Sequence, residues 1–301
     1  MNDNADNLFL NAKQVADYLD LNEKKVYAMA NERQLPGTKI TGKWLFPKAL
    51  IDRWIIESCH SGMLSDRLII TGSDDPLMHW VVGRVGQRIG SAGMVNYSAT
   101  DSRLGLTHLG QGYADVCCIH WGNEAERDLR HPALLKRHAN YKQWVLVHVA
   151  SRDYGLLMRN EHHHLGQAID EALSLRYRWL SRQEGAGARY HFDNWLSERG
   201  LSGTDINLVG TAFSERELAA GIARGEADFG FGCQGVAGEF GLAFLPLGRE
   251  SFDMVMPQGV FFRQHLQQLF NVMQHPDTLT HAQRLGGYDL TDSGKLLWSG
   301  A

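Results

Sequence analysis

The chain has 301 residues, of which 44% are hydrophobic and 21% charged, a balance that is ordinary for a soluble globular protein and excludes wholesale disorder. The formal net charge is −4, so no global positive field draws the chain to nucleic acid, and any DNA binding must be local. The N-terminus lacks the features of a signal peptide, and no apolar run approaches the roughly 20 residues that span a bilayer. We therefore expect a cytoplasmic protein.

The first predicted domain spans residues 8–57 and begins with two short helices. Asn11 and Asn22 stand where an N-cap is needed, before AKQVADYL and EKKVYAMANER, because the asparagine side chain accepts from free backbone N–H groups. Helical spacing buries Val26, Met29 and Ala30 of the second helix on one face. The opposite, exposed face then carries Lys24, Lys25, Tyr27 and Asn31.

A hairpin and a third helix complete this domain. TKITGKWLF consists of two short alternating runs hinged at Thr41-Gly42, which is a hairpin signal. Pro47 stands where a last helix, KALIDRWIIE, would begin. Two helices, a hairpin and a closing helix make a winged helix-turn-helix.

The same residues resemble the excisionase-type, MerR-like DNA-binding domains. The match comprises Val15, Ala16, Tyr18, Leu19, Val26, Tyr27, Leu35, Pro36, Lys39, Ile40, Gly42, Trp44 and Phe46. The resemblance implies that the second helix enters the major groove of double-stranded DNA, with Lys24, Lys25 and Tyr27 as contacts. Lys39 and Lys43 of the wing would then reach backbone phosphates. The alternative is that these lysines form only a solvated face.

Acidic and basic residues are equal in number within residues 1–60. A single module should therefore bind DNA weakly, and specific binding to an operator would need two copies on paired half-sites. We accordingly expect a homodimer.

Residues 58–66, SCHSGMLSD, are short and polar and are interpreted as a linker to a second domain at 67–301. That domain opens with a strand, a Gly-Ser-Asp turn and a helix whose Leu77, Val81, Val85 and Ile89 point inward. Alternating strand and helix patterns follow, and residues 141–159 are expected to form paired strands. This alternation predicts an α/β fold with mainly parallel sheets. Adjacent Cys117 and Cys118 lie in an apolar run and are expected to be buried thiols.

Three strand ends in this domain share one chemistry. Ser73 and Asp74 follow the first strand, Ser102 follows the second, and the turn Gly185-Ala186-Gly187 with Arg189 follows a third, each before a helix. The carboxyl ends of parallel strands, facing helix N-termini, are where anions and polar ligands bind in such sheets. The small residues of the third turn, between Arg182 and Arg189, favour an anion cradle over a flexible surface turn.

From about residue 67 to 298 the chain resembles cytoplasmic type II periplasmic-binding-protein-like domains, relatives of molybdate-binding proteins. The motifs that carry the resemblance occur in the family's order and are Gly72-Ser73-Asp74, Ala114-Asp115, Ile119-His120-Trp121, Arg152-Asp153-Tyr154-Gly155-Leu156, Arg182-Gln183-Glu184-Gly185, Ala219-Ala220-Gly221, Ala227-Asp228-Phe229-Gly230, Phe252-Asp253-Met254 and Gly287-Tyr288-Asp289. The resemblance implies two lobes, one of residues 67–150 and 250–301 and the other of residues 151–249, with a ligand in the cleft between them. Closure of the cleft would be a hinge motion.

The sequence departs from this family at the third turn. Ala186 and Ala188 replace the usual serine and threonine, so two hydroxyl donors are missing. Either main chain and arginine hold the ligand, or the ligand differs from the usual oxyanion.

The predicted ligand-binding set is Ser73, Asp74, Ser102, His120, Arg152, Arg182, Gly185, Ala186, Gly187 and Arg189. Alternative interpretations stay open: the serines as helix caps, Arg152 as part of a surface ion pair beside Asp153, and His120 as a buried hydrogen-bonding group. Glu215 is expected to be an acid on a helix surface. The run at residues 162–164 is three adjacent histidines, which cannot all face one ion, so a solvated loop is favoured over a metal site.

These features together predict a one-component transcriptional regulator that senses a small anion, with molybdate or tungstate favoured by resemblance only. No catalytic motif is present, so neither an enzyme nor a cofactor is expected. The alternatives are a molybdenum-cofactor-related binding protein or enzyme and a phage-type architectural DNA binder.

Overall fold

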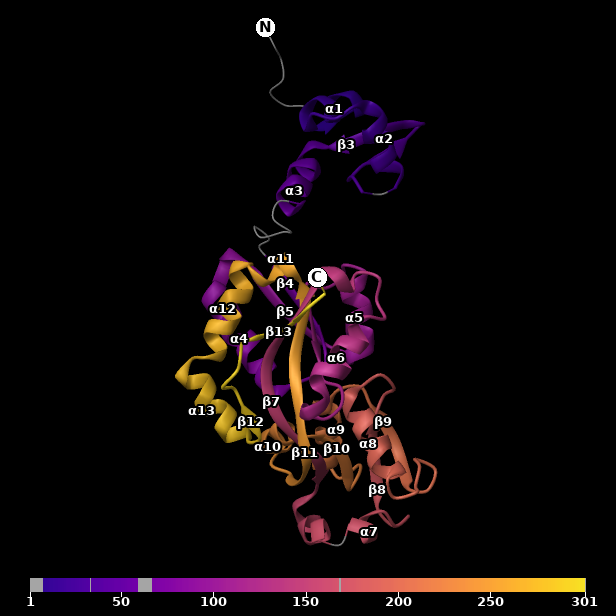
Figure 1. The fold of residues 1–301 in the computed structure, drawn as a ribbon, viewed down its shortest axis with the longest axis vertical. Helices are drawn as coiled ribbons and strands as arrows, with labels where there is room; N and C mark the ends of the chain where they lie inside the picture. The colour runs from indigo at the N-terminus through magenta and orange to yellow at the C-terminus, as the bar shows by residue number, and fades with distance from the viewer. Residues whose placement is uncertain (1–7, 33, 59–66, 168, 301) are drawn as a thin grey trace. The chain divides into compact units, whose positions relative to one another are not determined.

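The computed structural model describes residues 8–32, 34–58, 67–167 and 169–300. The chain forms two compact units, Met1–Ser65 and Asp66–Ala301 (Figure 1). Apart from Ser58, the predicted linker and Cys59 lie outside the described residues.

The first unit is built from short elements around a small apolar core. Its elements are β1 (Phe9–Leu10), α1 (Ala12–Leu19), α2 (Glu23–Asn31), β2 (Thr38–Ile40), β3 (Lys43–Pro47) and α3 (Lys48–Ser58). The strands form an antiparallel sheet in the order β1-β3-β2. Val15, Val26, Phe46 and Ile51 are fully buried at its centre.

Local signals in the sequence account for these elements. The side chains of Asn11 and Asn22 accept hydrogen bonds from the backbone N–H groups of Gln14 and Lys25, so both predicted N-caps are confirmed. Thr41 and Gly42 both have positive φ, 48° and 82°, which is the geometry of a tight two-residue hairpin turn. The predicted helix–helix–hairpin–helix order is therefore present.

The second unit alternates strands with helices in two lobes. Its strands are β4 (Arg67–Gly72), β5 (Met94–Ala99), β6 (Val116–Ile119), β7 (Trp144–Met158), β8 (Arg178–Arg182), β9 (Asn207–Ala212), β10 (Phe229–Cys233), β11 (Ala243–Pro257), β12 (Tyr288–Asp289) and β13 (Leu296–Ser299). Its α-helices are α4 (Pro76–Ile89), α5 (Ser102–Gly110), α6 (Arg127–Leu135), α7 (Ile169–Ala172), α8 (Gly187–Ser197), α9 (Glu215–Ala223), α10 (Gln234–Phe240), α11 (Gln258–Phe261), α12 (Gln264–Met273) and α13 (Pro276–Leu285). Short 3-10 helices occur at Gly90–Ala92 (η2), Glu124–Glu126 (η3), Tyr141–Gln143 (η4) and Asn160–Gln167 (η5).

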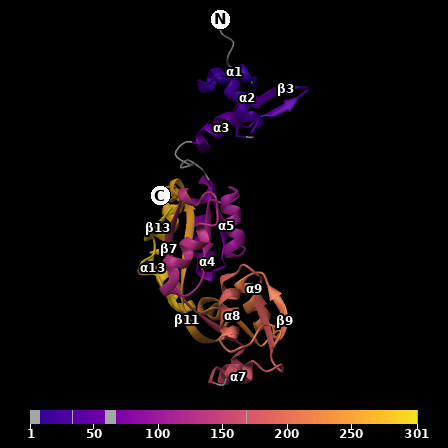
Figure 2. The same ribbon diagram turned by 45° about the vertical axis from the view of Figure 1, so that its right-hand side comes forward.

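One sheet runs through both lobes in the order β5-β4-β6-β11-β7-β10-β8-β9. The first lobe contains β4, β5 and β6 with α4 and α5, and the second contains β8, β9 and β10 with α8 and α9. The long strands β7 and β11 lie side by side and extend from one lobe into the other (Figures 1 and 2). Any motion of one lobe against the other must therefore bend this pair.

Two expectations about the sheet are wrong. Residues 141–159 form one continuous strand, β7, rather than a pair, because its partner is the distant β11. The sheet is also not mainly parallel at its centre: β4 is parallel to β5 and β6, and β8 to β9 and β10, but β7 and β11 run antiparallel to each other and to their outer neighbours.

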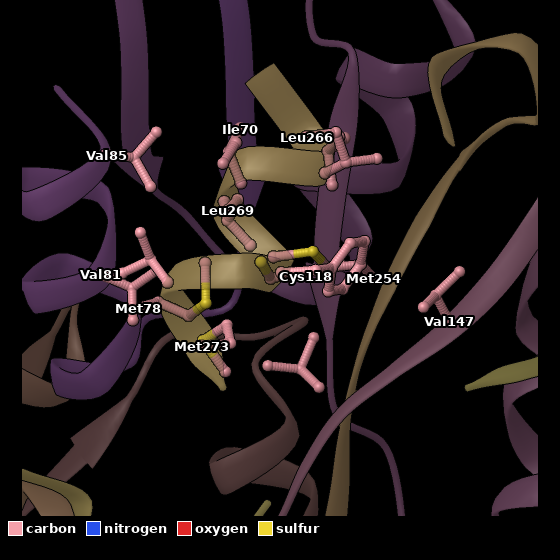
Figure 3. Close-up of a cluster of buried hydrophobic side chains, with 14 of the residues drawn as sticks. Ile70, Met78, Val81, Val85, Cys118, Val147, Met254, Leu266, Leu269 and Met273 are labelled. Atoms are coloured by element: carbon pink, nitrogen blue, oxygen red, sulfur yellow. The ribbon is translucent and has the colours of Figure 1, made fainter. Parts of the chain in front are cut away.

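The core of the first lobe lies between α4, α12 and the sheet. Figure 3 shows Val81 and Val85 of α4 and Leu266 and Leu269 of α12 gathered around Ile70 of β4. The inward face predicted for α4 is confirmed, since Leu77, Val81 and Val85 are at most 1% exposed. Cys117 and Cys118 are buried, as expected. None of the described helices is both long and apolar enough to cross a membrane.

Candidate functional site

Polar residues follow β4 and β5 at the edge of the first lobe that faces the second. Gly72 ends β4 with φ of 103°, and a Cβ there would lie 2.1 Å from the Cys118 carbonyl oxygen, so only glycine fits. Asp75 and Asp101 then cap α4 and α5. The buried hydroxyls of Ser73 and Ser102 lie 2.8 Å apart and bond each other.

The small-residue turn after β8 touches this edge directly. A Cβ at Gly185 would lie 2.8 Å from Asp101 Oδ1, and one at Gly187 would lie 2.5 Å from His120 Nε2. Ala186, the N-cap of α8, offers no capping side chain. The glycines thus permit the close backbone approach that the sequence suggested, and the surface they approach is the other lobe.

Arg152 of β7 is the centre of a buried ion cluster between the lobes. Its Nε donates to Glu250 Oε1 at 2.8 Å, and its Nη1 donates to Asp75 Oδ2 at 2.8 Å and to the Asp74 carbonyl oxygen at 3.4 Å. Its Nη2 donates to Glu215 Oε1 at 3.1 Å and to His120 Nδ1 at 3.2 Å. A guanidinium has five N–H donors, and the protein uses all five. Arg152 is therefore a connection between lobes with no donor left for a ligand.

His120 is a neutral imidazole with one unused donor. Because a guanidinium only donates, Nδ1 of His120 must accept from Arg152, which leaves the proton on Nε2. Burial lowers the pKa of His120 to about 3, in spite of attraction from Glu250. Nε2 is buried, has no hydrogen-bond partner and lies 3.9 Å from Glu215 Oε1.

Arg182 differs from Arg152 although both are buried. Its Nε donates to Gln183 Oε1 and the Ala212 carbonyl oxygen, and its Nη2 donates to the Phe213 carbonyl oxygen. Within the described part of the chain Nη1 donates no hydrogen bond, and no carboxylate oxygen lies within 4.0 Å of the guanidinium. At 2% exposure Arg182 is a buried cation without an ion pair.

Further contacts join the lobes around this cluster. The Arg216 backbone N–H donates to Asp74 Oδ2, and Gln183 Nε2 donates to the Thr100 carbonyl oxygen. Trp121 after β6 stacks on Tyr190 of α8 with ring centroids 5.1 Å apart. The two lobes are thus in contact along one face.

The structure brings most predicted ligand-binding residues to this interface. Ser73, Asp74, Ser102, His120, Arg152, Arg182, Gly185, Ala186 and Gly187 all contact it or lie directly behind it. Arg189 does not join them: its guanidinium pairs with Asp193 one turn along α8 at 2.7 Å and touches the Arg182 carbonyl oxygen. The hydroxyl groups of Ser73 and Ser102 form a hydrogen bond with each other.

Two sequence-based interpretations are wrong. Glu215 is not a surface acid: it is 1% exposed and accepts from Arg152 and from the Cys233 backbone N–H, because α9 begins at the lobe interface. Arg152 does not form a surface ion pair with Asp153 but is itself buried. Sequence reasoning missed Asp75, Asp101 and Glu250, although Asp75 and Asp101 follow the two strand ends that it singled out.

The histidines at 162–164 lie within the 3-10 helix η5 rather than in a loop. His162 stacks on Phe229, and its Nε2 lies 3.6 Å from Asp228 Oδ1. In the residues that the structure describes, no group of three or more His, Cys, Asp or Glu side chains could hold a metal ion.

The side chains predicted to contact DNA share one property, which is exposure. Lys24, Lys25 and Tyr27 project from α2, and Lys39 and Lys43 lie on the hairpin β2–β3. Val26 and Ala30, on the opposite face of α2, are buried against the core.

Comparison with known protein families assigns a family to each of the two units. The PBP superfamily domain matches residues 87–274, and the helix-turn-helix domain, an excisionase-type family, matches residues 9–58. The chain belongs to the PBP superfamily. Its second unit is a type II periplasmic-binding-protein-like domain. The predicted fusion of a helix-turn-helix domain with such a domain is thereby confirmed.

Individual relatives are distant. The chain is 25% identical over 193 residues to "Uncharacterized protein YvgK" of Bacillus subtilis (strain 168), which covers 64% of this chain and 62% of that protein. The solved structure of a tungstate ABC transporter from Geobacter sulfurreducens is similar with a TM-score of 0.51 and 13% identity, covering 72% of this chain and 97% of that one. A putative phosphate ABC transporter substrate-binding protein with bound phosphate from Clostridium perfringens has a TM-score of 0.50 and 9% identity, covering 73% and 97%. These solved structures share the fold of the second unit, and the chain spans less than two thirds of the length of the Bacillus subtilis protein.

Proposed function

We propose that this protein is a transcriptional regulator that binds a small anion between the two lobes and double-stranded DNA through its helix-turn-helix domain. The anion changes DNA affinity to the extent that it binds more tightly to one arrangement of the lobes than to the other. Molybdate and tungstate are candidates by resemblance, and the solved relatives named for tungstate and phosphate extend the set to oxyanions in general.

The observation that carries this proposal is the state of Arg182. A buried cation without a counter-ion is costly, and the cost is relieved when an anion binds beside it. Burial lowers the pKa of Arg182, although attraction from Glu215, Asp74 and Asp101 opposes this effect. His120 Nε2 and the uncapped N-terminus of α8 add donors at the same interface.

The test is thermal stabilisation and calorimetric binding of the full chain with phosphate, sulfate, molybdate and tungstate. We expect at least one anion to raise the melting temperature of the wild type and Arg182→Gln to lose this effect. Arg189→Gln is the matched control, because Arg189 lies on the other side of the same turn but is paired with Asp193, and it should respond like the wild type. Arg182→Lys keeps the positive charge and should therefore still respond to the anion. A response of this variant shows that the loss in Arg182→Gln is a loss of anion binding and not of folding. If no anion stabilises the wild type, the proposed ligand class is wrong.

For the DNA-binding part we propose Lys24, Lys25 and Tyr27 as contacts in the major groove and Lys39 and Lys43 as contacts to phosphates. Their exposure on α2 and on the hairpin supports this assignment. A homodimer on paired half-sites remains the arrangement we propose, because one module carries no net positive charge.

A further inference from the structure

Among the described residues at the lobe interface, three polar groups near the turn after β8 have unused hydrogen-bonding capacity, whereas His191 Nε2 and Glu250 Oε2 face each other at 3.0 Å. Two are donors, Arg182 Nη1 and the Nε2–H of His120. The third is an acceptor, Asp101 Oδ2: the capping bond from the Leu104 backbone N–H goes to Oδ1, and no described residue donates to Oδ2. Both donors and the acceptor belong to side chains at most 7% exposed.

These three groups surround one turn. Asp101 Oδ1 lies 2.8 Å from the Cβ position of Gly185, and His120 Nε2 lies 2.5 Å from that of Gly187. Arg182 ends the strand that leads into this turn, and it interacts electrostatically with both Asp101 and His120. A ligand held by Arg182 and His120 would therefore lie next to the carboxylate of Asp101.

The charge balance here is unfavourable for a ligand that only accepts hydrogen bonds. The single positive charge of Arg152 is shared among the carboxylates of Asp75, Glu215 and Glu250. This group of four side chains therefore carries excess negative charge and supplies no positive charge to a ligand. Asp101 adds to that excess, as does Asp74 beside His79, and of the two buried guanidinium groups in the described part of the chain Arg182 still has a free donor group. A fully deprotonated dianion would satisfy Arg182 and His120 but would place an oxygen against the open acceptor of Asp101. That contact would be repulsive and would leave Asp101 without a donor.

From these two donors and one acceptor we infer that the ligand is an anion that also carries a hydrogen-bond donor group, and that this group donates to Asp101. The inference rests on the proposed anion-sensing function and narrows its ligand class. Two sources supply such chemistry: an oxyanion that keeps a proton at neutral pH, such as hydrogen phosphate or arsenate, and a small zwitterion with a carboxylate and an ammonium group. Sulfate, molybdate and tungstate carry no proton at neutral pH and are expected to bind more weakly.

The experiment compares ligands on the full chain by calorimetry at pH 7.5. The probes are phosphate, arsenate, glycine, sulfate, molybdate and tungstate, with the wild type and Asp101→Asn. Asparagine caps a helix as well as aspartate does, so α5 should be retained, which a melting curve without ligand verifies. Asp193→Asn, an equal change of charge on the exposed face of α8, is the control.

The wild type should bind phosphate or glycine at least about tenfold more tightly than sulfate or molybdate, the ratio expected when a ligand oxygen faces the Asp101 carboxylate with no proton between them. Asp101→Asn should reduce that ratio at least about tenfold, because the amide can donate to a bare oxygen, and Asp193→Asn should leave it unchanged. A preference for glycine over phosphate, or the reverse, identifies which of the two sources applies.

Equal or tighter binding of sulfate, molybdate or tungstate by the wild type would overturn the inference while leaving anion sensing intact. An unchanged ratio in Asp101→Asn would also overturn it. Binding by none of the probes would contradict the proposed function itself, and the inference with it.

Discussion

His120 is held neutral by burial, which links the stability of the protein to pH. Its pKa is about 3 in the folded chain, whereas an unfolded histidine titrates near 6.5. Between these values the unfolded chain binds a proton that the folded chain does not. The free energy of unfolding is therefore not reduced by His120 above pH 6.5. It falls as the pH drops below 6.5, because protonation of this histidine then favours the unfolded chain.

This linkage predicts a specific effect of removing the imidazole. His120→Asn keeps an acceptor near Nδ1 for Arg152 but cannot titrate, so the variant should lose less stability than the wild type between pH 6.5 and pH 5. The difference should approach about 1.4 kcal/mol per pH unit. Urea denaturation at several pH values measures it. His164→Gln, a change at an exposed histidine, should follow the wild type, and parallel curves for His120→Asn and the wild type would contradict the prediction.

Arg152 is the cation shared by three buried carboxylates. Arg152→Met removes the cation and leaves Asp75, Glu215 and Glu250 buried together, so we expect a loss of about 3–5 kcal/mol of unfolding free energy. Arg189→Met, which breaks only a half-exposed pair within one helix, should cost less than about 1 kcal/mol. Chemical denaturation distinguishes the two, and similar losses would show that the ion cluster does not hold the lobes.

The approach of α8 to the first lobe depends on the absence of a side chain at the first residue of this helix, Gly187. A Cβ at Gly187 would lie 2.2 Å from His120 Cδ2 and 2.3 Å from the His120 carbonyl oxygen, so α8 or β6 would have to move. Gly187→Ala should therefore destabilise the second unit by about 1–3 kcal/mol and weaken anion binding.

The control for this change is Gly203→Ala. The nearest atom to a Cβ at Gly203 is Leu208 Cδ2 at 4.0 Å, which is ordinary contact. Its melting temperature should equal that of the wild type. A melting curve of Gly187→Ala that also matched the wild type would mean that the two lobes do not meet at this turn in solution.

Two copies of the chain should bind one operator. Sedimentation velocity of the full chain with an operator duplex should give two chains per duplex. Lys24→Ala together with Lys25→Ala should weaken binding to the operator more than binding to unrelated DNA, without changing anion binding. One chain per duplex at saturation would contradict the dimer, and unchanged affinity of the double variant would contradict the assignment of α2.

How far the site could be predicted follows from the distances along the chain that its contacts bridge. The strand ends at Gly72 and the turn at Gly185 were visible in the sequence, because glycines and small polar residues before a helix are local signals. The partners of Arg152 were not, since Asp75, Glu215 and Glu250 lie 77, 63 and 98 positions away. Arg189 was predicted to face the ligand from its place in the turn, but one helical turn brings it to Asp193 instead.

Features that depend on neighbours within a few residues could be predicted from the amino-acid sequence: the caps Asn11 and Asn22, the hairpin at Thr41-Gly42, the buried face of α4 and the order of motifs that places the chain in its superfamily. Only the tertiary structure decided that β7 and β11 pair antiparallel through both lobes, that Glu215 is buried, and that Arg152 is saturated while Arg182 keeps free donors. The reason is physical: helix caps and turns are set by local hydrogen bonds, whereas the charge state and availability of a buried group depend on what other segments bring within a few ångströms.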